Sequence, residues 1–191
     1  MLSEQDKEHT HYFSIINSEI IRMNSIIQEF LILSKPHEAN LKIHNIRGLA
    51  HEVILLFQSE AHYRNVDIKY SYDEDLLPVM CEGNALKQVF INLMKNSLEA
   101  MPAGGQIRFH INNGNGKVVI AIEDDGMGMP EHILKDAGKP FFTTKDDGTG
   151  LGLMISERII HQHKGALSIT SHVNSGTRIE ITLPAAHMES V

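Results

Sequence analysis

Four short blocks of polar residues and glycines follow one another along this chain, and their order constrains the fold more than any other feature. They are Asn92-Leu-Met-Lys-Asn96, Asp124-Asp-Gly-Met-Gly128, Phe141-Phe-Thr-Thr-Lys145 and Gly148-Thr-Gly-Leu-Gly-Leu153, and Gly176-Thr177 closes the series. Each block alone is a weak indication of function, because short motifs of these residue types also occur in ordinary turns. All of them together, in one order within a domain-sized stretch, predict one common site.

Apolar residues between the blocks recur with the periods of helices and strands. The pattern predicts helices over 43–64, 86–100 and 151–163, and strands over 66–72, 106–111, 117–123, 166–171 and 177–183. The segment Asn112-Asn-Gly-Asn-Gly116 is typical of a β-hairpin connection. We therefore expect an α+β fold, a two-layer sandwich in which helices cover one face of a mixed, largely antiparallel sheet.

The first part of the chain has a different pattern and divides from the rest near Pro36. Large apolar side chains recur there at three- and four-residue steps, at Phe13, Ile16, Ile20, Met23, Ile27 and Phe30. We expect one amphipathic bundle or coiled-coil helix in residues 1–36 and a globular domain in residues 37–191. Because a lone helix cannot bury its own stripe, residues 12–34 are predicted to form a homodimer or higher assembly. Packing of the stripe against the chain's own globular domain is the alternative.

Composition excludes several classes of protein. The net charge of −7 argues against a nucleic-acid partner, since such proteins carry a basic excess. Cys81 is the single cysteine, which excludes an internal disulfide and favours a reducing compartment. No apolar run approaches the roughly 18 residues of a membrane span, and the N-terminus has no signal-peptide pattern. We expect a cytoplasmic chain that makes no membrane contact of its own.

The blocks carry side chains that suit a phosphorylated ligand. The glycines of 148–153 precede a predicted helix, where backbone N–H groups and the helix N-terminus can face an anion. Thr143, Thr144 and Lys145 add hydroxyls and an ammonium group just before them. Asn92 and Asn96 place two carboxamides on one helix face, one turn apart, and amide oxygens suit Mg²⁺. A flexible linker for the glycines and local helix capping for the asparagines are the structural alternatives.

Together the blocks resemble the ATP-binding catalytic domain of sensor histidine kinases, in the superfamily shared with gyrase, the ATP-dependent heat-shock chaperone and mismatch-repair ATPases. The stretch Leu77-Pro-Val-Met-Cys-Glu-Gly-Asn84 is similar to the run before the asparagine helix in sporulation-type bacterial kinases. Phe30-Leu-Ile-Leu-Ser-Lys-Pro36 is similar to the end of the second helix of their dimerisation hairpin. The resemblance therefore covers residues 12–184.

The resemblance implies ATP and Mg²⁺ as cofactors and gives each block a role. Asn96 would ligate Mg²⁺, Asp124 would accept a hydrogen bond from the adenine amino group, and residues 130–148 would form a mobile ATP lid. Asn92 stands where gyrase-like ATPases carry a water-activating glutamate, so transfer is favoured over hydrolysis. Asn92 and Asn96 are the expected catalytic residues. The implied cofactor-binding residues are Asn92, Lys95, Asn96, Asp124, Gly126, Gly128, Met129, Thr143, Thr144, Lys145, Gly148, Thr149, Gly150, Leu151, Gly152, Leu153 and Thr177.

The chain departs from the family pattern in lacking a recognisable phosphoacceptor block. His51-Glu52 is followed by Val53-Ile-Leu-Leu-Phe57, without the basic residue and proline that the family places there. We therefore expect transfer of the ATP γ-phosphate to a histidine outside this chain, on a hairpin domain that serves a response regulator. The alternatives are a non-catalytic ATP-binding dimerisation module and a relative of the anti-sigma-type serine kinases, although the latter place an acidic base where Asn92 stands.

Overall fold

The structure is a computed structural model, which describes residues 40–145 and 148–186 together with eight residues nearer the N-terminus. The chain forms two compact units, residues 1–37 and 38–191. The described residues of the first unit are helical, and their large apolar side chains are exposed: Tyr12, Phe13, Ile16, Ile20, Met23 and Ile27. Phe30 and Pro36, which complete the predicted stripe and helix end, lie outside the described residues.

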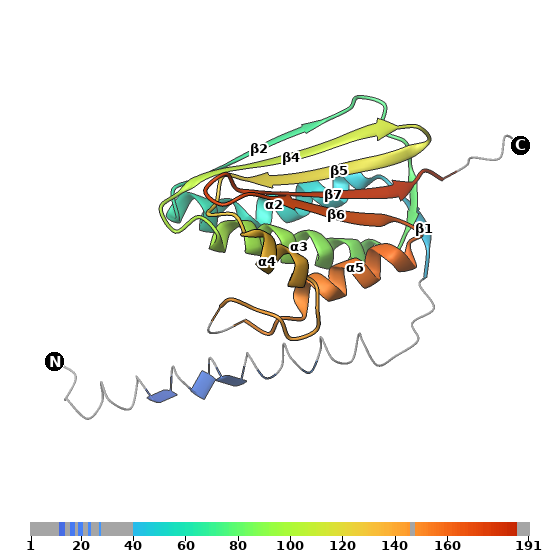
Figure 1. Ribbon diagram of the computed structural model, residues 1–191. Helices are drawn as coiled ribbons and strands as arrows, with labels where there is room; N and C mark the ends of the chain where they lie inside the picture. Colours follow the sequence, from blue (N-terminus) through green and yellow to red (C-terminus); the bar gives the residue numbers. More distant parts are fainter. Residues whose placement is uncertain are drawn as a thin grey trace, which may run out of the picture. The chain divides into compact units, whose positions relative to one another are not determined.

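A five-stranded sheet with the order β2-β4-β5-β7-β6 forms one layer of the second unit (Figure 1). Its strands are β2 Val66–Tyr72, β4 Gly105–Gly114, β5 Lys117–Asp124, β6 Ala166–Ser171 and β7 Thr177–Pro184. Strands β2 and β4 pair in parallel, and the other neighbours pair antiparallel. The mixed, largely antiparallel sheet that the sequence predicts is therefore confirmed.

Three helices, α2 Ile46–Tyr63, α3 Gly83–Glu99 and α5 Gly152–Gln162, lie on the same face of this sheet (Figure 1). Their buried stripes meet the inward residues of the strands, and Phe90 of α3 contacts Phe109 of β4 edge to face at 5.6 Å between ring centroids. This arrangement confirms the predicted two-layer sandwich. No helix among the described residues combines the length and hydrophobicity needed to cross a bilayer.

Two short strands, β1 Lys42–His44 and β3 Val79–Cys81, form a separate antiparallel pair that the sequence did not reveal. Three residues are too few for strand alternation to be recognised. The predicted helix over 43–64 consequently begins later, at Ile46, where the Asn45 side chain accepts a hydrogen bond from the Arg47 N–H at 3.0 Å. Cys81 is fully buried, and burial raises the pKa of its thiol to about 12, so it packs as a small apolar side chain.

Strands β2 and β6 match their predicted ranges, and the other boundaries differ from the predictions by at most three residues. The hairpin between β4 and β5 is tighter than the segment predicted for it, because Asn115 and Gly116 both adopt positive φ, as a two-residue type I′ turn requires. Within the predicted lid, a short helix, α4 Glu131–Asp136, follows Pro130. The segment predicted as a lid is therefore partly regular structure, and the third block and the first residues of the fourth lie between α4 and α5.

Candidate functional site

Helix α3 is the platform of the site. Its apolar stripe, which includes Phe90 and Leu93, is fully buried against the sheet. Asn92 and Asn96 lie one turn apart at the edge of this stripe and are partly exposed. Because the stripe fixes the rotation of the helix, both carboxamides are held at the boundary between the core and solvent.

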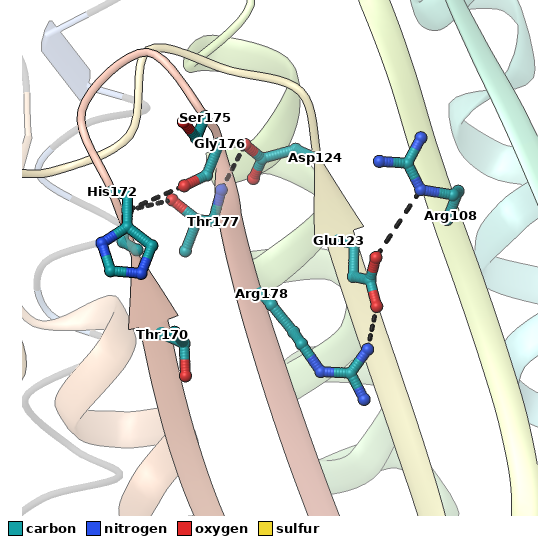
Figure 2. Close-up of a pocket in the computed structure, with 10 residues that line it drawn as sticks. Arg108, Glu123, Asp124, Thr170, His172, Ser175, Gly176, Thr177 and Arg178 are labelled. Atoms are coloured by element: carbon teal, nitrogen blue, oxygen red, sulfur yellow. Dashed lines mark hydrogen bonds and ion pairs between the residues drawn. The ribbon is translucent and has the colours of Figure 1, made fainter.

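Asp124 ends strand β5 and is 7% exposed. Its Oδ1 accepts hydrogen bonds from the backbone N–H of Gly126 at 3.0 Å and of Thr177 at 3.1 Å. Figure 2 shows the carboxylate reaching across to Thr177 at the start of the neighbouring strand β7. The structure therefore brings together two residues that lie far apart in the sequence and that the resemblance assigned to the adenine.

The buried carboxylate has a perturbed pKa. Burial raises the pKa of Asp124 above its ordinary value, while hydrogen bonds from Gly126, from the Ser97 hydroxyl and from Thr177 oppose this shift. Ser97, on α3 beside Asn96, was not predicted as a site residue. A serine within an otherwise apolar helical stripe is the sequence feature that could have revealed it, since buried hydroxyls need partners.

The glycines after Asp124 allow the loop to approach α3. A Cβ at Gly126 would lie 2.8 Å from the Ala100 Cβ, so only glycine fits there. Gly128 has φ +64°, which glycine adopts without strain. The next residue, Met129, donates its backbone N–H to the Ser171 hydroxyl at 2.9 Å.

Ser171 in turn shares a 2.9 Å hydrogen bond with the Thr177 hydroxyl. The predicted adenine-side residues Asp124, Gly126, Gly128, Met129 and Thr177 thus form one connected group. Ser171, the last residue of β6, is a member of this group that the sequence did not indicate.

Asn92 contacts the start of α5. Its amide donates a hydrogen bond to the Ser156 hydroxyl at 2.9 Å, and that hydroxyl donates to the Gly152 carbonyl at 3.0 Å. A Cβ at Gly152 would collide with the Asn92 carboxamide. The fourth block is therefore seated directly against the first, and Ser156, a hydroxyl on the buried stripe of α5, is a further residue that the sequence analysis missed.

Lys145 reaches from the predicted lid to α3. Its ammonium group donates to the Asn96 Oδ1 at 3.0 Å and forms an ion pair with Glu99. Thr143 supports this turn by accepting a hydrogen bond from the Lys145 N–H at 3.1 Å. Glu99 was not predicted. Its position at the end of the helix gave no indication that it would meet a lysine 46 residues later.

The remaining predicted residues occupy less direct positions. Lys95 is mostly exposed, with its ammonium 3.9 Å from Glu99. Leu151 is buried, so its side chain anchors the loop, and only its backbone can face a ligand. Its N–H donates to the Thr149 hydroxyl at 3.3 Å. The other members lie in the same loop or at the start of α5: Thr144, Gly148, Gly150 and Leu153.

A small cavity of about 130 Å³ adjoins Asp124 and Thr177 on the open face of the sheet (Figure 2). Glu123 crosses it and forms ion pairs with Arg108 and Arg178 on the two flanking strands. Its lining includes no residue of α3 or of the lid. Ligand sites usually enclose about 300–1,000 Å³, so this cavity is a neighbour of the assembled site rather than the site itself.

Residues 81–187, more than half of the chain, match the family described as Histidine kinase-, DNA gyrase B-, and HSP90-like ATPase. The chain therefore belongs to this family and carries an ATP-binding domain of its kind. The matched segment begins in β3 and includes all four blocks and Thr177. Membership confirms the resemblance that the blocks suggested.

Named relatives and solved structures agree with this placement. Sporulation kinase E of Bacillus subtilis (strain 168) is 43% identical over 178 residues, which are 93% of this chain and 24% of that protein. The chain thus spans about a quarter of the length of this curated relative. The histidine kinase ThkA, solved in complex with the response regulator protein TrrA, matches with a TM-score of 0.78 and 29% identity over 94% of this chain and 52% of that one.

Full-length ShkA, solved in complex with AMPPNP, shares the fold. It matches with a TM-score of 0.85 at 20% identity, over 100% of this chain and 41% of that one. Together with the ThkA match, this likeness confirms the predicted α+β architecture.

The Lys145–Glu99 ion pair is expected to hold the third block on α3. Glu99→Gln removes the charge while keeping the length of the side chain, and partly exposed pairs contribute about 0.2–1 kcal/mol. Hydrogen–deuterium exchange of the backbone amides of residues 143–145 should therefore be roughly two- to fivefold faster in the variant. Glu131→Gln, which breaks a pair with Lys135 inside α4, is the control. Equal exchange in Glu99→Gln and the wild type would contradict this role.

Asp124 is expected to cost the fold stability at neutral pH. Since the folded-state pKa is raised, the contribution of this group to stability is fully present below its unfolded pKa and is lost as pH rises through the folded value. Asp124→Asn keeps an acceptor oxygen and has no charge to bury. Its free energy of unfolding relative to the wild type, measured by denaturant titration, should therefore increase between about pH 4 and pH 7. The exposed Asp67→Asn serves as control, and a pH-independent difference for Asp124→Asn would refute the account.

Proposed function

We propose that this chain is the ATP-binding catalytic part of a two-component sensor histidine kinase and transfers the ATP γ-phosphate to a histidine outside these residues. Family membership and the similarity to sporulation kinase E support this assignment. In this proposal, residues 1–36 are a dimerisation helix and residues 37–191 the catalytic domain. The intact kinase would act in the cytoplasm, where a response regulator is available to receive the phosphoryl group.

The proposal depends mainly on one observation: helix α3 contacts both the residues proposed for the adenine and those proposed for the phosphates. Asn96 of α3 accepts a hydrogen bond from the lid ammonium of Lys145. The hydroxyl of the next residue, Ser97, is buried beside the Asp124 carboxylate and lowers its pKa. A nucleotide whose adenine amino group donates to Asp124 would therefore extend along α3, with its phosphates toward Asn96, Lys145 and the glycines at the start of α5.

Asn96 also fits the proposed role of magnesium ligand. Its amide oxygen already accepts from a cationic ammonium group, and Glu99 beside it adds negative charge. Among the described residues, no group of three or more His, Cys, Asp or Glu side chains could hold a metal ion. Mg²⁺ would therefore take its remaining ligands from phosphate oxygens and water, as it prefers to do. Once bound, it would neutralise charge on the transferred phosphoryl group.

The contacts of Asn92 favour transfer over hydrolysis. Its amide nitrogen donates to Ser156, and its carboxamide lies against Gly152. An amide cannot accept a proton from water at neutral pH, so Asn92 would not act as a general base for hydrolysis. We assign it the role of seating the glycine block, while the acceptor imidazole supplies the attacking nitrogen.

This assignment is tested with labelled ATP and a separately supplied hairpin domain that bears the acceptor histidine. The wild type should transfer acid-labile label to the hairpin. Asn96→Ala should abolish transfer, because the metal ligand is lost. The control is Asn84→Ala, which replaces an exposed asparagine on the first turn of α3 and should behave as the wild type.

Asp124→Asn should weaken ATP binding by roughly tenfold or more, since a hydrogen bond to a charged group is worth about 1.5–3 kcal/mol. ATP binding without any transfer would favour a non-catalytic module, and full transfer by Asn96→Ala would refute its role.

Residues 12–34 are proposed to join copies of the chain. The described apolar side chains of this helix, including Ile20 and Ile27, are exposed, and contiguous apolar patches on soluble proteins usually mark contact surfaces. Ile20→Glu combined with Ile27→Glu should release monomers that still bind ATP, because the site is built from residues of the second unit. Sedimentation velocity at tens of micromolar checks this. Replacement of the polar Asn17 by Glu is the control, and a monomeric wild type would overturn the proposal.

A further inference from the structure

A second cavity lies between helix α2 and the edge strand β2. Its volume is about 460 Å³, within the range of about 300–1,000 Å³ that is usual for sites of small molecules. The lining residues are Asn45, Arg47, Gly48, His51, Tyr70 and Tyr72. None of them belongs to the four blocks of polar residues and glycines, and the family match begins only at residue 81.

This cavity is separate from the nucleotide-binding region. Tyr72 pairs with Ile111 of β4, whereas Asp124 pairs with Ile107 of the same strand, so the two features lie toward opposite ends of β4. Strand β2 is also an edge strand, separated by β4 from β5. A ligand in this cavity would therefore contact none of the residues assigned to ATP.

Arg47 gives the cavity a positive charge that the described residues do not neutralise. Its guanidinium lies over the ring of Tyr72 at 5.4 Å from the centroid. In the described part of the chain, the guanidinium has no ion-pair partner and no carbonyl that accepts from it. A cation–π contact uses no N–H···O hydrogen bond, so the guanidinium N–H groups can still bind a carboxylate in bidentate fashion. No acidic residue lines the cavity, so its chemistry favours an anion.

Aromatic rings form the other walls. The rings of Tyr70 and Tyr72 are 5.6 Å apart at 30°, and His51 meets Tyr70 edge to face at 5.8 Å. The Tyr72 hydroxyl is buried and has no hydrogen-bond partner among the described residues. Buried hydroxyls are normally paired, so the missing partner is a further unusual feature of this part of the fold. These walls present flat apolar surface beside the cationic group.

We propose that this cavity binds a small planar organic acid, with its carboxylate on the Arg47 guanidinium and its flat body against the tyrosine rings. A neutral ring would forgo the charge-assisted hydrogen bonds. An organic cation would meet the repulsion of Arg47 and of the positive N-terminal end of α2. The cavity volume also exceeds what one carboxylate alone would fill, so the apolar body of the ligand contributes to its binding.

The proposal is tested by titrating the ¹⁵N-labelled full chain with benzoate and following amide chemical shifts. Saturable shifts are expected at Arg47, Gly48, His51 and Tyr70, with no shifts around Asp124. Acetate, which lacks the ring, and benzylamine, which carries the opposite charge, are the comparison probes and should bind at least tenfold more weakly. Equal binding of the three probes, shifts centred on Asp124, or no saturable shift with benzoate would each overturn the proposal.

Two variants test benzoate binding in the cavity independently of each other. Arg47→Gln should weaken benzoate binding at least tenfold, since it removes a charged hydrogen-bond partner, whereas Arg64→Gln at the other end of α2 should leave it unchanged. Gly48→Leu removes no native group. A Cβ at Gly48 meets no atom within 4 Å, so the new side chain would fill the cavity and block the ligand while the helix persists. Benzoate binding that survives in folded Gly48→Leu would refute the site even if Arg47→Gln failed to fold.

Discussion

The burial of α3 against the sheet is the interaction on which the rest of this structure depends. Phe90 and Leu93 are fully buried, and side chains of this size contribute about 1.5–3 kcal/mol each. Their contacts fix both the position and the rotation of the helix. Because Asn92, Asn96 and Ser97 lie on that helix, the same packing sets the glycine block, Lys145 and the Asp124 carboxylate relative to one another. A shift of α3 would displace both halves of the site together.

Asp124 shows how stability and function compete in this fold. A carboxylate at a nearly buried strand end is unfavourable for folding, and the raised pKa reports that cost. Hydrogen bonds from Gly126, Thr177 and Ser97 offset part of it. The same donors hold the group in one orientation, so a ligand that donates to its remaining lone pairs meets a preorganised acceptor. The unfavourable burial of charge is thus confined to Asp124. The surrounding backbone of β5 and β7 determines the position of this residue.

The local sequence predicted most of the secondary structure. Strand β2 over Val66–Tyr72 and strand β6 over Ala166–Ser171 matched their predicted ranges, because alternation over six or seven residues is unambiguous. The short strands β1 and β3 were not predicted, because three residues are too few to show the two-residue alternation of a strand. Nor could the parallel pairing of β2 with β4 be read locally, because strand partners are chosen by contacts between distant segments.

The sequence by itself determined which residue types stand at the helix starts and strand ends, and hence the chemistry that the blocks offer. Only the tertiary structure decided their partners. Ser97 and Ser156 lie within helix stripes that are otherwise apolar. Their hydroxyls acquire a role only because the fold places Asp124 opposite Ser97 and Asn92 opposite Ser156. Glu99 meets Lys145 across 46 residues of chain. The reason is physical: periodicity records which face of an element is buried, whereas a hydrogen bond or ion pair between elements depends on how those faces are brought together.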